Sequence, residues 1–143
     1  MKKILFISSS RADYGLLKNV IIETQKLNKE TYLLVTGSHL SREFGKTFSE
    51  IIKDKIKNKI KKKILDKNFK DSNVSNYLIK SIKITRDVIK KVKPDVLVIL
   101  GDRYEILGSA IASMISRIPI AHIHGGELTL GALDDSIRHS ITK

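Results

Sequence analysis

The chain has no cysteine and no tryptophan, and only two of its 143 residues are proline. Without cysteine there is no disulfide framework, no thiolate metal site and no cysteine nucleophile, so any catalysis falls to carboxylates and histidines. No apolar run approaches the roughly 20 residues of a membrane-spanning helix, and the N-terminal run is too short for a signal peptide. These absences lead us to expect a cytoplasmic protein with no membrane partner.

The net charge of +12 is concentrated in the middle of the chain. Residues 53–93 hold 15 basic and 4 acidic side chains, whereas residues 1–52 hold 8 and 5, and residues 94–143 hold 4 and 6. Lysine dominates the basic segment, which contains one arginine, Arg86, and few aromatic residues. Nucleic-acid sites usually add arginine forks and stacking rings. We therefore interpret the segment as a solvated lysine surface and expect no nucleic-acid partner.

Short apolar runs alternate with helical patterns along the chain. The runs with the length and branching of buried parallel strands are 4–7, 32–35, 96–100 and, more weakly, 120–123. The segments with apolar residues at helical spacing are 15–27, 41–54, 74–92 and 105–115. The alternation predicts an α/β fold with a doubly wound parallel sheet, and the length suits one domain.

Residues 53–72 fit neither pattern clearly. Ile56, Ile60 and Ile64 recur every four residues among lysines, which favours a helical stripe. Ile64 and Leu65 are equally compatible with the end of a short strand, so both alternatives stay open at this point.

In a doubly wound sheet the ligand lies beyond the carboxyl ends of the strands, so the loops there are candidate sites. After the first strand, three serines and Arg11 run into a helix N-terminus, whose unpaired N–H groups suit phosphate. Arg11 would add a guanidinium fork. The alternative is that the serines cap the helix while Arg11 pairs with Asp13 or with solvent.

The loops after the second and third strands carry His39 and Asp102. We expect His39 to be an exposed surface histidine, with a position facing the crevice as the alternative, and Ser41 to cap the next helix. Asp102 projects from a strand end, where burial would suit a working acid or base. Spacing alone favours another role, in which Asp102 caps the helix that begins near Tyr104 and Arg103 is its surface partner.

The fourth loop combines two histidines, a glycine pair and a carboxylate. In an extended segment His122 and His124 share one face. Gly125 and Gly126 let the backbone approach a ligand closely, and Glu127 leaves the strand end beside the expected position of Asp102. A histidine pair near carboxylates can bind zinc or manganese, but no third ligand stands at a recognisable spacing, so we expect no metal.

A helical pattern follows the fourth loop. Asp134 and Asp135 open it, where the helix dipole favours carboxylates and where they could hold a substrate hydroxyl. The alternative is that Asp134 with Arg138, and Asp135 with His139, form ordinary i,i+4 ion pairs. Residues 134–143 have no helix stop signal.

Four segments, taken in order, resemble the hydrolysing UDP-N-acetylglucosamine 2-epimerases of sialic acid biosynthesis: 10–15, 36–40, 101–105, and 122–127 with 134–143. The family has two Rossmann-like domains in the arrangement called GT-B, with the substrate between them. The resemblance covers the N-terminal half of this fold. It implies that residues 1–143 form the N-terminal domain, incomplete at its C-terminal helix, and that the C-terminal nucleotide-binding domain is absent.

The resemblance implies conversion of UDP-N-acetylglucosamine and water to N-acetylmannosamine and UDP, without a redox cofactor. A base removes the proton at C2 while UDP leaves, and water then adds to the glycal. Close alternatives are the hydrolysing epimerase of UDP-diacetylbacillosamine and the non-hydrolysing epimerase. A UDP-sugar would be the partner, and the full-length protein would be a homo-oligomer. An inactive sugar-nucleotide-binding fragment is the competing hypothesis, and we expect the isolated chain to be inactive.

Carried over by position, Arg11 would contact phosphate, and Asp102 and Asp134 would match family carboxylates implicated in proton transfer. Many relatives have glutamate at the position of His124, so the C2 base could be His124, Glu127 or neither. The predicted catalytic residues are Asp102, His124, Glu127 and Asp134. The predicted substrate-binding residues are Ser10, Arg11, His39, Arg103, Gly125, Gly126, Asp135 and Arg138.

Overall fold

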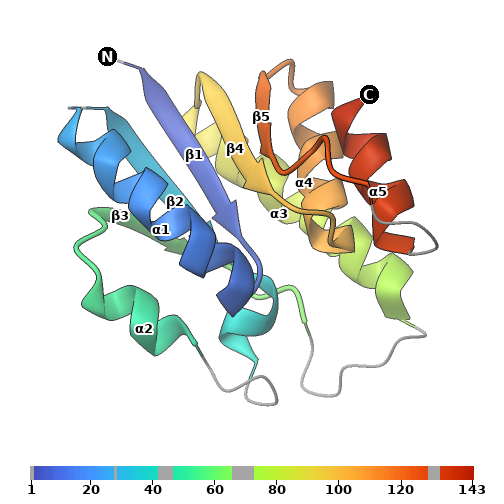
Figure 1. Cartoon of the computed structure of the whole chain (residues 1–143), viewed down its shortest axis with the longest axis horizontal. Coiled ribbons are helices and arrows are strands. Elements are labelled where there is room, and N and C mark those ends of the chain that lie inside the picture. The colour runs from blue at the N-terminus through green and yellow to red at the C-terminus, as the bar shows by residue number, and fades with distance from the viewer. Residues whose placement is uncertain (1, 28, 42–46, 66–72, 129–132) are drawn as a thin grey trace.

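The computed structural model describes residues 2–27, 29–41, 47–65, 73–128 and 133–143. Five parallel strands form one sheet in the order β3-β2-β1-β4-β5 (Figure 1). The strands are β1 (Lys3–Ser8), β2 (Glu30–Val35), β3 (Asn58–Lys61), β4 (Val96–Leu100) and β5 (Ile120–Ile123). The helices are α1 (Arg11–Lys26), the short 3-10 helix η1 (Gly37–Leu40), α2 (Phe48–Lys53), α3 (Val74–Val92), α4 (Tyr104–Ile115) and α5 (Leu133–Thr142). This strand order confirms the predicted doubly wound, Rossmann-like sheet.

The sheet separates two apolar cores. Phe6 on β1 packs among residues of α1 and α2, whereas its neighbours Leu5 and Ile7 pack among residues of α3 and α4. Successive side chains of a strand point to opposite faces, so an unbroken apolar run buries both faces at once. In Figure 1, α1 lies on one side of the sheet and α3 and α4 lie on the other.

The four apolar runs predicted as strands are all strands of the sheet. The helices predicted over 15–27, 74–92 and 105–115 are also present, as α1, α3 and α4. The prediction for 41–54 was partly wrong, because the described part of that segment is helical only over Phe48–Lys53 and residues 42–46 lie outside the described residues. Thr47, not Ser41, occupies the N-cap of α2, and Ser41 ends η1 by donating its backbone N–H to the Ser38 carbonyl.

The ambiguous segment 53–72 contains an edge strand, so the helical stripe was the wrong alternative. β3 pairs with β2 from Tyr32↔Asn58 to Val35↔Lys61, and the Asn58 side chain donates to the Thr31 carbonyl at 3.0 Å. Ile64 and Leu65 follow the strand and are buried in a small cluster with Tyr77. An edge strand exposes its lysines easily, which explains the weak apolar signal.

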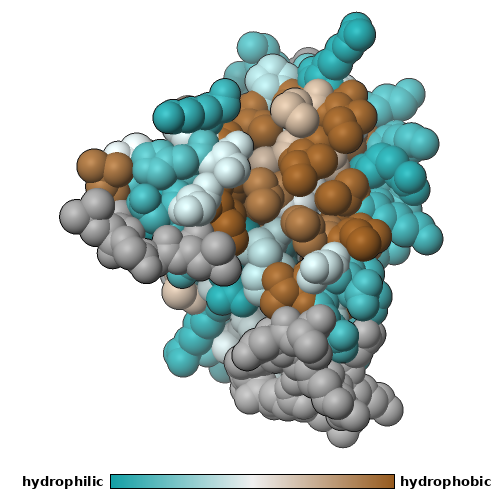
Figure 2. All heavy atoms as spheres, turned by 90° about the vertical axis from the view of Figure 1, so that its right-hand side faces the viewer, coloured by the Kyte–Doolittle hydropathy of each residue, from teal (hydrophilic) through white to brown (hydrophobic). Residues whose placement is uncertain are grey.

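β5 forms the opposite edge of the sheet and borders an apolar groove. The groove runs between α4, β5 and α5, and among its lining residues are Leu107, Ile111, Met114, Ile118 and Ile141. Figure 2 faces this side and shows the apolar residues gathered there. None of the described helices is long and apolar enough to cross a membrane.

α3 and α4 approach closely because Gly108 has no side chain. A Cβ atom at this position would lie 2.8 Å from Ser81 Cβ and 3.0 Å from the Leu78 carbonyl oxygen. The contact surface between α3 and α4, here called the α3–α4 seam, contains buried serine and threonine hydroxyl groups that have hydrogen-bond partners. Ser81 Oγ donates to the Glu105 carbonyl, and Ser109 Oγ lies 3.0 Å from Thr85 Oγ1. A larger residue therefore has to push the two helices apart.

Replacing Gly108 by alanine should lower the free energy of unfolding by about 1–3 kcal/mol, because the new methyl group overpacks the α3–α4 seam. Gly15→Ala in α1 is the matched control: a Cβ there meets nothing within 4 Å, and the substitution should add about 0.5–1 kcal/mol of stability through helix propensity. Urea denaturation measures both effects. Equal stabilities for the two variants would contradict the seam's dependence on glycine.

Candidate functional site

The candidate site lies where the strand order reverses. β1 has β2 on one side and β4 on the other, and the chain leaves the carboxyl ends of β1 and β4 into adjacent loops. Such a switch point leaves a crevice at the edge of the sheet, because the connections leave in opposite directions. The loops after β2 and β5 flank it.

The loop after β1 is a capping box. Ser10 is the N-cap of α1 and accepts from the Asp13 backbone N–H at 3.3 Å, which confirms that serine caps this helix. The buried Asp13 carboxylate accepts from Ser9 Oγ at 2.8 Å and from the Ser10 N–H at 3.0 Å. The capping box therefore occupies two N–H groups at the helix start, those of Ser10 and Asp13, that were expected to face a phosphate. The role of Ser10 in binding substrate stays a prediction.

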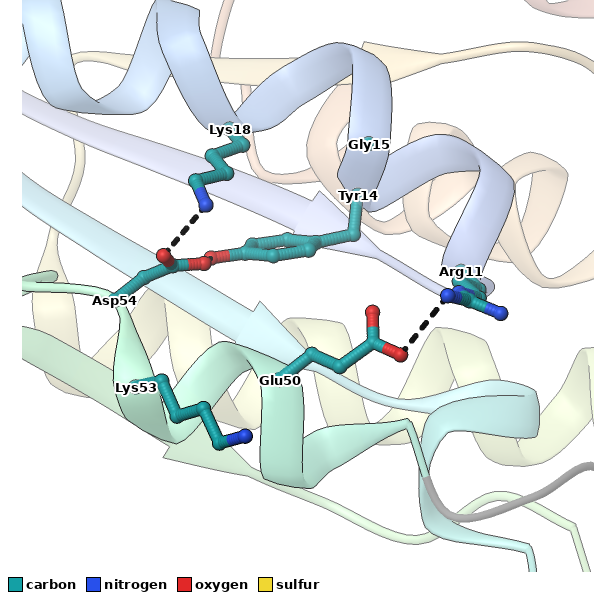
Figure 3. A pocket seen from close by; sticks show the side chains of 7 residues that line it. All are labelled: Arg11, Tyr14, Gly15, Lys18, Glu50, Lys53 and Asp54. Atoms are coloured by element: carbon teal, nitrogen blue, oxygen red, sulfur yellow. Dashed lines mark hydrogen bonds and ion pairs between the residues drawn. The ribbon is translucent and has the colours of Figure 1, made fainter.

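Arg11 points toward α2 and not toward Asp13. Its guanidinium lies 3.2 Å from the Glu50 carboxylate, so the alternative in which Arg11 pairs with Asp13 was wrong. Figure 3 shows Arg11 and Glu50 reaching toward each other across a pocket between α1 and α2. With a side chain 72% exposed, Arg11 still has room to meet an anion, and its phosphate contact stays a prediction.

The same pocket contains a second ionic cluster, centred on Asp54 (Figure 3). The Tyr14 hydroxyl donates to Asp54 at 2.5 Å, and Lys18 Nζ lies 2.6 Å from its other oxygen. Burial opposes ionisation of Asp54, but the Lys18 and Tyr14 donors hold its pKa below the ordinary value. Burial and the bond to Asp54 raise the pKa of Tyr14. This cluster ties α1 to α2 beside the site.

His39 is buried, which contradicts the expected surface histidine. Its Nε2 lies 2.8 Å from Ser8 Oγ and its Nδ1 lies 2.7 Å from Thr47 Oγ1, so hydroxyl groups satisfy both ring nitrogens. The Tyr14 ring meets the imidazole edge to face at 6.1 Å. Burial lowers the pKa of His39 from its ordinary value to about 4, although Asp13 and Glu50 act in the opposite direction. The structure thus holds His39 as a neutral link between β1, η1 and the start of α2.

The loop after β4 does not use Asp102 as a helix cap. Arg103 stands at the N-cap of α4 without a capping bond from its side chain, so the role favoured from spacing was wrong. Arg103 is not a partner of Asp102 either, because its guanidinium binds both oxygens of Glu105 at 3.2 Å. The Glu105 side chain is fully buried. Burial would lower the pKa of Arg103, but the Glu105 carboxylate raises it above its ordinary value.

Asp102 is held by Arg138 of α5. Arg138 Nε donates to Asp102 Oδ2 at 3.0 Å, and Nη2 of the same guanidinium donates to that oxygen as well. Arg138 Nη1 donates to the Glu127 carbonyl at 2.8 Å. The Arg138 side chain is 8% exposed and that of Asp102 21%. One guanidinium thereby contacts both the Asp102 carboxylate and the backbone carbonyl of Glu127.

His124 does not share a face with His122. The strand ends at Ile123, and His124 takes a left-handed backbone conformation with φ 60°, which breaks the alternation of side chains. The His124 imidazole pairs with the exposed Glu127 carboxylate three residues on. His122 instead contacts the Gly101 carbonyl and Thr142. Two of the predicted catalytic residues, His124 and Glu127, are therefore each other's partners.

The first turn of α5 carries the remaining predicted carboxylates. Asp134 is exposed. Arg138 pairs with Asp102 and Asp135, so the alternative in which it pairs with Asp134 was wrong. The expected pair of Asp135 with His139 is confirmed at 3.4 Å. Gly125 is buried, whereas Gly126 is exposed. Across the part of the chain that the structure describes, no three His, Asp or Glu residues gather as a metal site.

Sequence reasoning missed two contributors to this edge. Glu105 was treated as an ordinary helix residue, yet it is the buried anion that holds Arg103. Thr142 was not considered, yet its hydroxyl contacts His122 of β5 and the carbonyl of Gly125. The available signal for Glu105 was a single acidic residue in the first turn of an otherwise apolar helix. No local pattern signals the second.

Comparison with known proteins places the chain in a family. Residues 22–143 match the family model described as UDP-N-acetylglucosamine 2-epimerase. The chain belongs to this family. Its sheet is one half of the two-domain GT-B fold.

Two relatives show how far the similarity extends. Over 99% of this chain and 37% of its own length, the GDP/UDP-N,N'-diacetylbacillosamine 2-epimerase (hydrolyzing) of Campylobacter jejuni is 45% identical. The polysialic acid biosynthesis protein P7 of Escherichia coli is 38% identical over 100% of this chain and 37% of its own length. The chain thus spans less than two fifths of the length of these epimerase relatives.

Solved structures of the epimerase family share the fold. The crystal structure of UDP-GlcNAc 2-epimerase from Neisseria meningitidis bound to UDP-GlcNAc covers 98% of this chain and 38% of its own, with a TM-score of 0.77 and 22% identity. A UDP-GlcNAc 2-epimerase from Methanocaldococcus jannaschii covers 99% of this chain and 36% of its own, with a TM-score of 0.75 and 21% identity. At such identities the likeness supports the fold.

The buried His39 predicts a pH dependence of stability. Because its folded pKa of about 4 lies below the unfolded value of 6.5, the unfolded chain binds more protons between these values. The free energy of unfolding should be highest above pH 6.5 and fall as the pH drops toward 4, by up to about 3 kcal/mol at 1.4 kcal/mol per pKa unit. Urea denaturation between pH 4 and 7 measures the slope. His39→Gln should flatten it, and an unchanged slope in this variant would contradict the assignment.

Proposed function

We propose that this chain is the N-terminal half of a hydrolysing UDP-sugar 2-epimerase, and that the edge of its sheet forms one wall of the substrate cleft. The observation that carries the proposal is Asp102, a carboxylate at the switch point that Arg138 holds in one orientation. The family match and the hydrolysing relative support the reaction type. The product sugar would enter sialic acid or related nonulosonic acid biosynthesis in the cytoplasm.

The proposed reaction needs groups that move protons at C2 and C1 of the sugar. A carboxylate base removes the C2 proton as UDP leaves, and an acid–base group then directs water to the glycal. The Arg138 guanidinium compensates the charge of the Asp102 carboxylate at a half-buried position. The His124–Glu127 pair supplies a second proton-carrying group on the same edge, and the exposed Asp134 a third.

The substrate is a UDP-sugar with an acetamido group at C2. UDP-N,N'-diacetylbacillosamine is the favoured sugar nucleotide because the relative named for it is 45% identical to this chain, and UDP-N-acetylglucosamine is the second candidate because relatives named for it match the same residues. We further propose that a second domain holds the nucleotide, since relatives are more than twice as long. The 143 residues alone would then release no UDP, and the full-length enzyme would be a homo-oligomer.

A chimaera tests the proposal. Residues 1–143 replace the matching 37% of the Campylobacter jejuni relative, and UDP release is measured with each of the two UDP-sugars in D2O. We expect free UDP and a product sugar with deuterium at C2, because the C2 proton is exchanged during the reaction. Release of a UDP-linked epimer would instead identify a non-hydrolysing enzyme.

Asp102→Asn in this chimaera should reduce turnover by at least about a hundredfold, the usual contribution of an acid–base group. Asp95→Asn is the matched control: Asp95 lies at the opposite end of β4, where its carboxylate accepts from the Lys3 backbone N–H at 2.7 Å. The control should keep near-normal turnover. Near-normal turnover of the Asp102 variant would remove Asp102 from the proposed site.

A further inference from the structure

His122 links the carboxyl end of β4 to α5. Its Nε2 lies 2.7 Å from the Gly101 carbonyl oxygen, and its Nδ1 lies 2.9 Å from Thr142 Oγ1. A carbonyl oxygen only accepts hydrogen bonds, so Nε2 carries a proton and donates it. The ring thus reaches from β5 to the residue before Asp102 on one side and to Thr142 of α5 on the other.

The Thr142 hydroxyl has three neighbours within hydrogen-bond distance. Besides His122, it contacts the Gly125 carbonyl at 2.8 Å and the Arg138 carbonyl at 3.0 Å. The contact with Arg138 joins residues one helical turn apart. The contact with Gly125 joins the helix to the turn after β5. The hydroxyl has one proton, so it donates to one of these three acceptors at a time while all three stay within reach.

Gly125 is the residue that allows this approach. A Cβ atom at position 125 would lie 2.6 Å from His122 Nδ1 and 2.8 Å from Thr142 Oγ1. Both distances are shorter than contacts that carbon atoms make with polar atoms, so any side chain would push the ring and the hydroxyl apart. We name the contact between His122, Thr142 and Gly125 the His122 clasp. Its three residues pack without room for a side chain at position 125.

The clasp acts on the residue that holds Asp102. Arg138 lies one turn before Thr142 on the same face of α5, and its guanidinium reaches Asp102 and the Glu127 carbonyl. Hydrogen bonds from neighbouring segments to a helix keep its side chains in one orientation. We propose that His122 is a positioning residue: with Thr142 and Gly125 it holds the Thr142 turn of α5 against β5 and so keeps Arg138 on Asp102. The inference rests on geometry alone, so it and the proposed reaction can fail separately.

The test measures how often Arg138 leaves Asp102. In the 143-residue chain, NMR reports the exchange of the Arg138 Nε–H proton with water, which is slow while this proton is bonded to Asp102. Thr142→Val keeps the shape of the side chain but removes its hydroxyl, and we expect the exchange to speed up about fivefold, as for one lost hydrogen bond. Thr142→Ser keeps the hydroxyl and should stay within about twofold of the unmodified chain.

Two further variants separate clamping from a general loss of stability. Ser140→Ala removes a hydroxyl of the same helix whose bond, to the Ser136 carbonyl at 2.8 Å, stays within α5, and it should leave the Arg138 exchange unchanged. His122→Phe should match Thr142→Val, and the double variant should add little, because both residues act through one contact. Faster exchange in Ser140→Ala equal to that in Thr142→Val would overturn the proposal. So would an unchanged rate in Thr142→Val.

The unmodified chain provides a test that needs no variant. The His122 Nε2–H proton must give an observable, slowly exchanging NMR signal, because it is bonded to the Gly101 carbonyl. A signal lost to rapid exchange at neutral pH would overturn the proposal even if the variants failed to fold.

Discussion

β1 pairs in parallel with β2 along its whole length and with β4 over Ile4↔Val96 to Phe6↔Val98. A slip of one residue would turn Phe6 from the α1 core to the α3–α4 core and expose the opposite set, so the register is strongly fixed. Because the strands are parallel, their carboxyl ends lie at one edge of the sheet. The loops that carry Ser10 and Asp102 therefore start from fixed, neighbouring positions, and the site depends on this pairing.

The elements that could be predicted from the sequence are those whose signal is local. β1 and β4 are buried on both faces, and a strand with that environment must be an unbroken apolar run. α3 shows helical spacing over its full length and ends beside Pro94. β3 gave no such signal, because an edge strand of sequence Asn-Lys-Ile-Lys needs only Ile60 to face the core. α2 is short, and tertiary packing of Ile51 contributes more to it than helix propensity.

The site divides along the same line. Ser10 and Asp13 stand three residues apart, so the capping box could be predicted from spacing. Asp102 and Arg138 are 36 residues apart, and each has a plausible local role, as a helix cap or in an i,i+4 pair, that spacing favours over the true one. His39 looked exposed because its hydroxyl partners come from β1 and from the start of α2. The prediction that His122 and His124 share a face was wrong because His124 has a positive φ, which ends the alternation of the strand.

The Arg138–Asp102 pair is a poor means of stabilising a fold. Removing charges from water costs much of what their attraction returns, and apolar residues of similar volume often serve equally well at such positions. α5 already packs against the apolar core beside α4 through Ile141, so the ion pair is not the sole contact that holds this helix. What the ion pair adds is orientation: two N–H groups fix a carboxylate at the switch point, while a third N–H group of Arg138 binds the backbone carbonyl of Glu127. An oriented carboxylate suits a surface that meets another molecule, so the ion pair and the neighbouring His122 clasp agree with the proposed substrate cleft at this edge of the sheet.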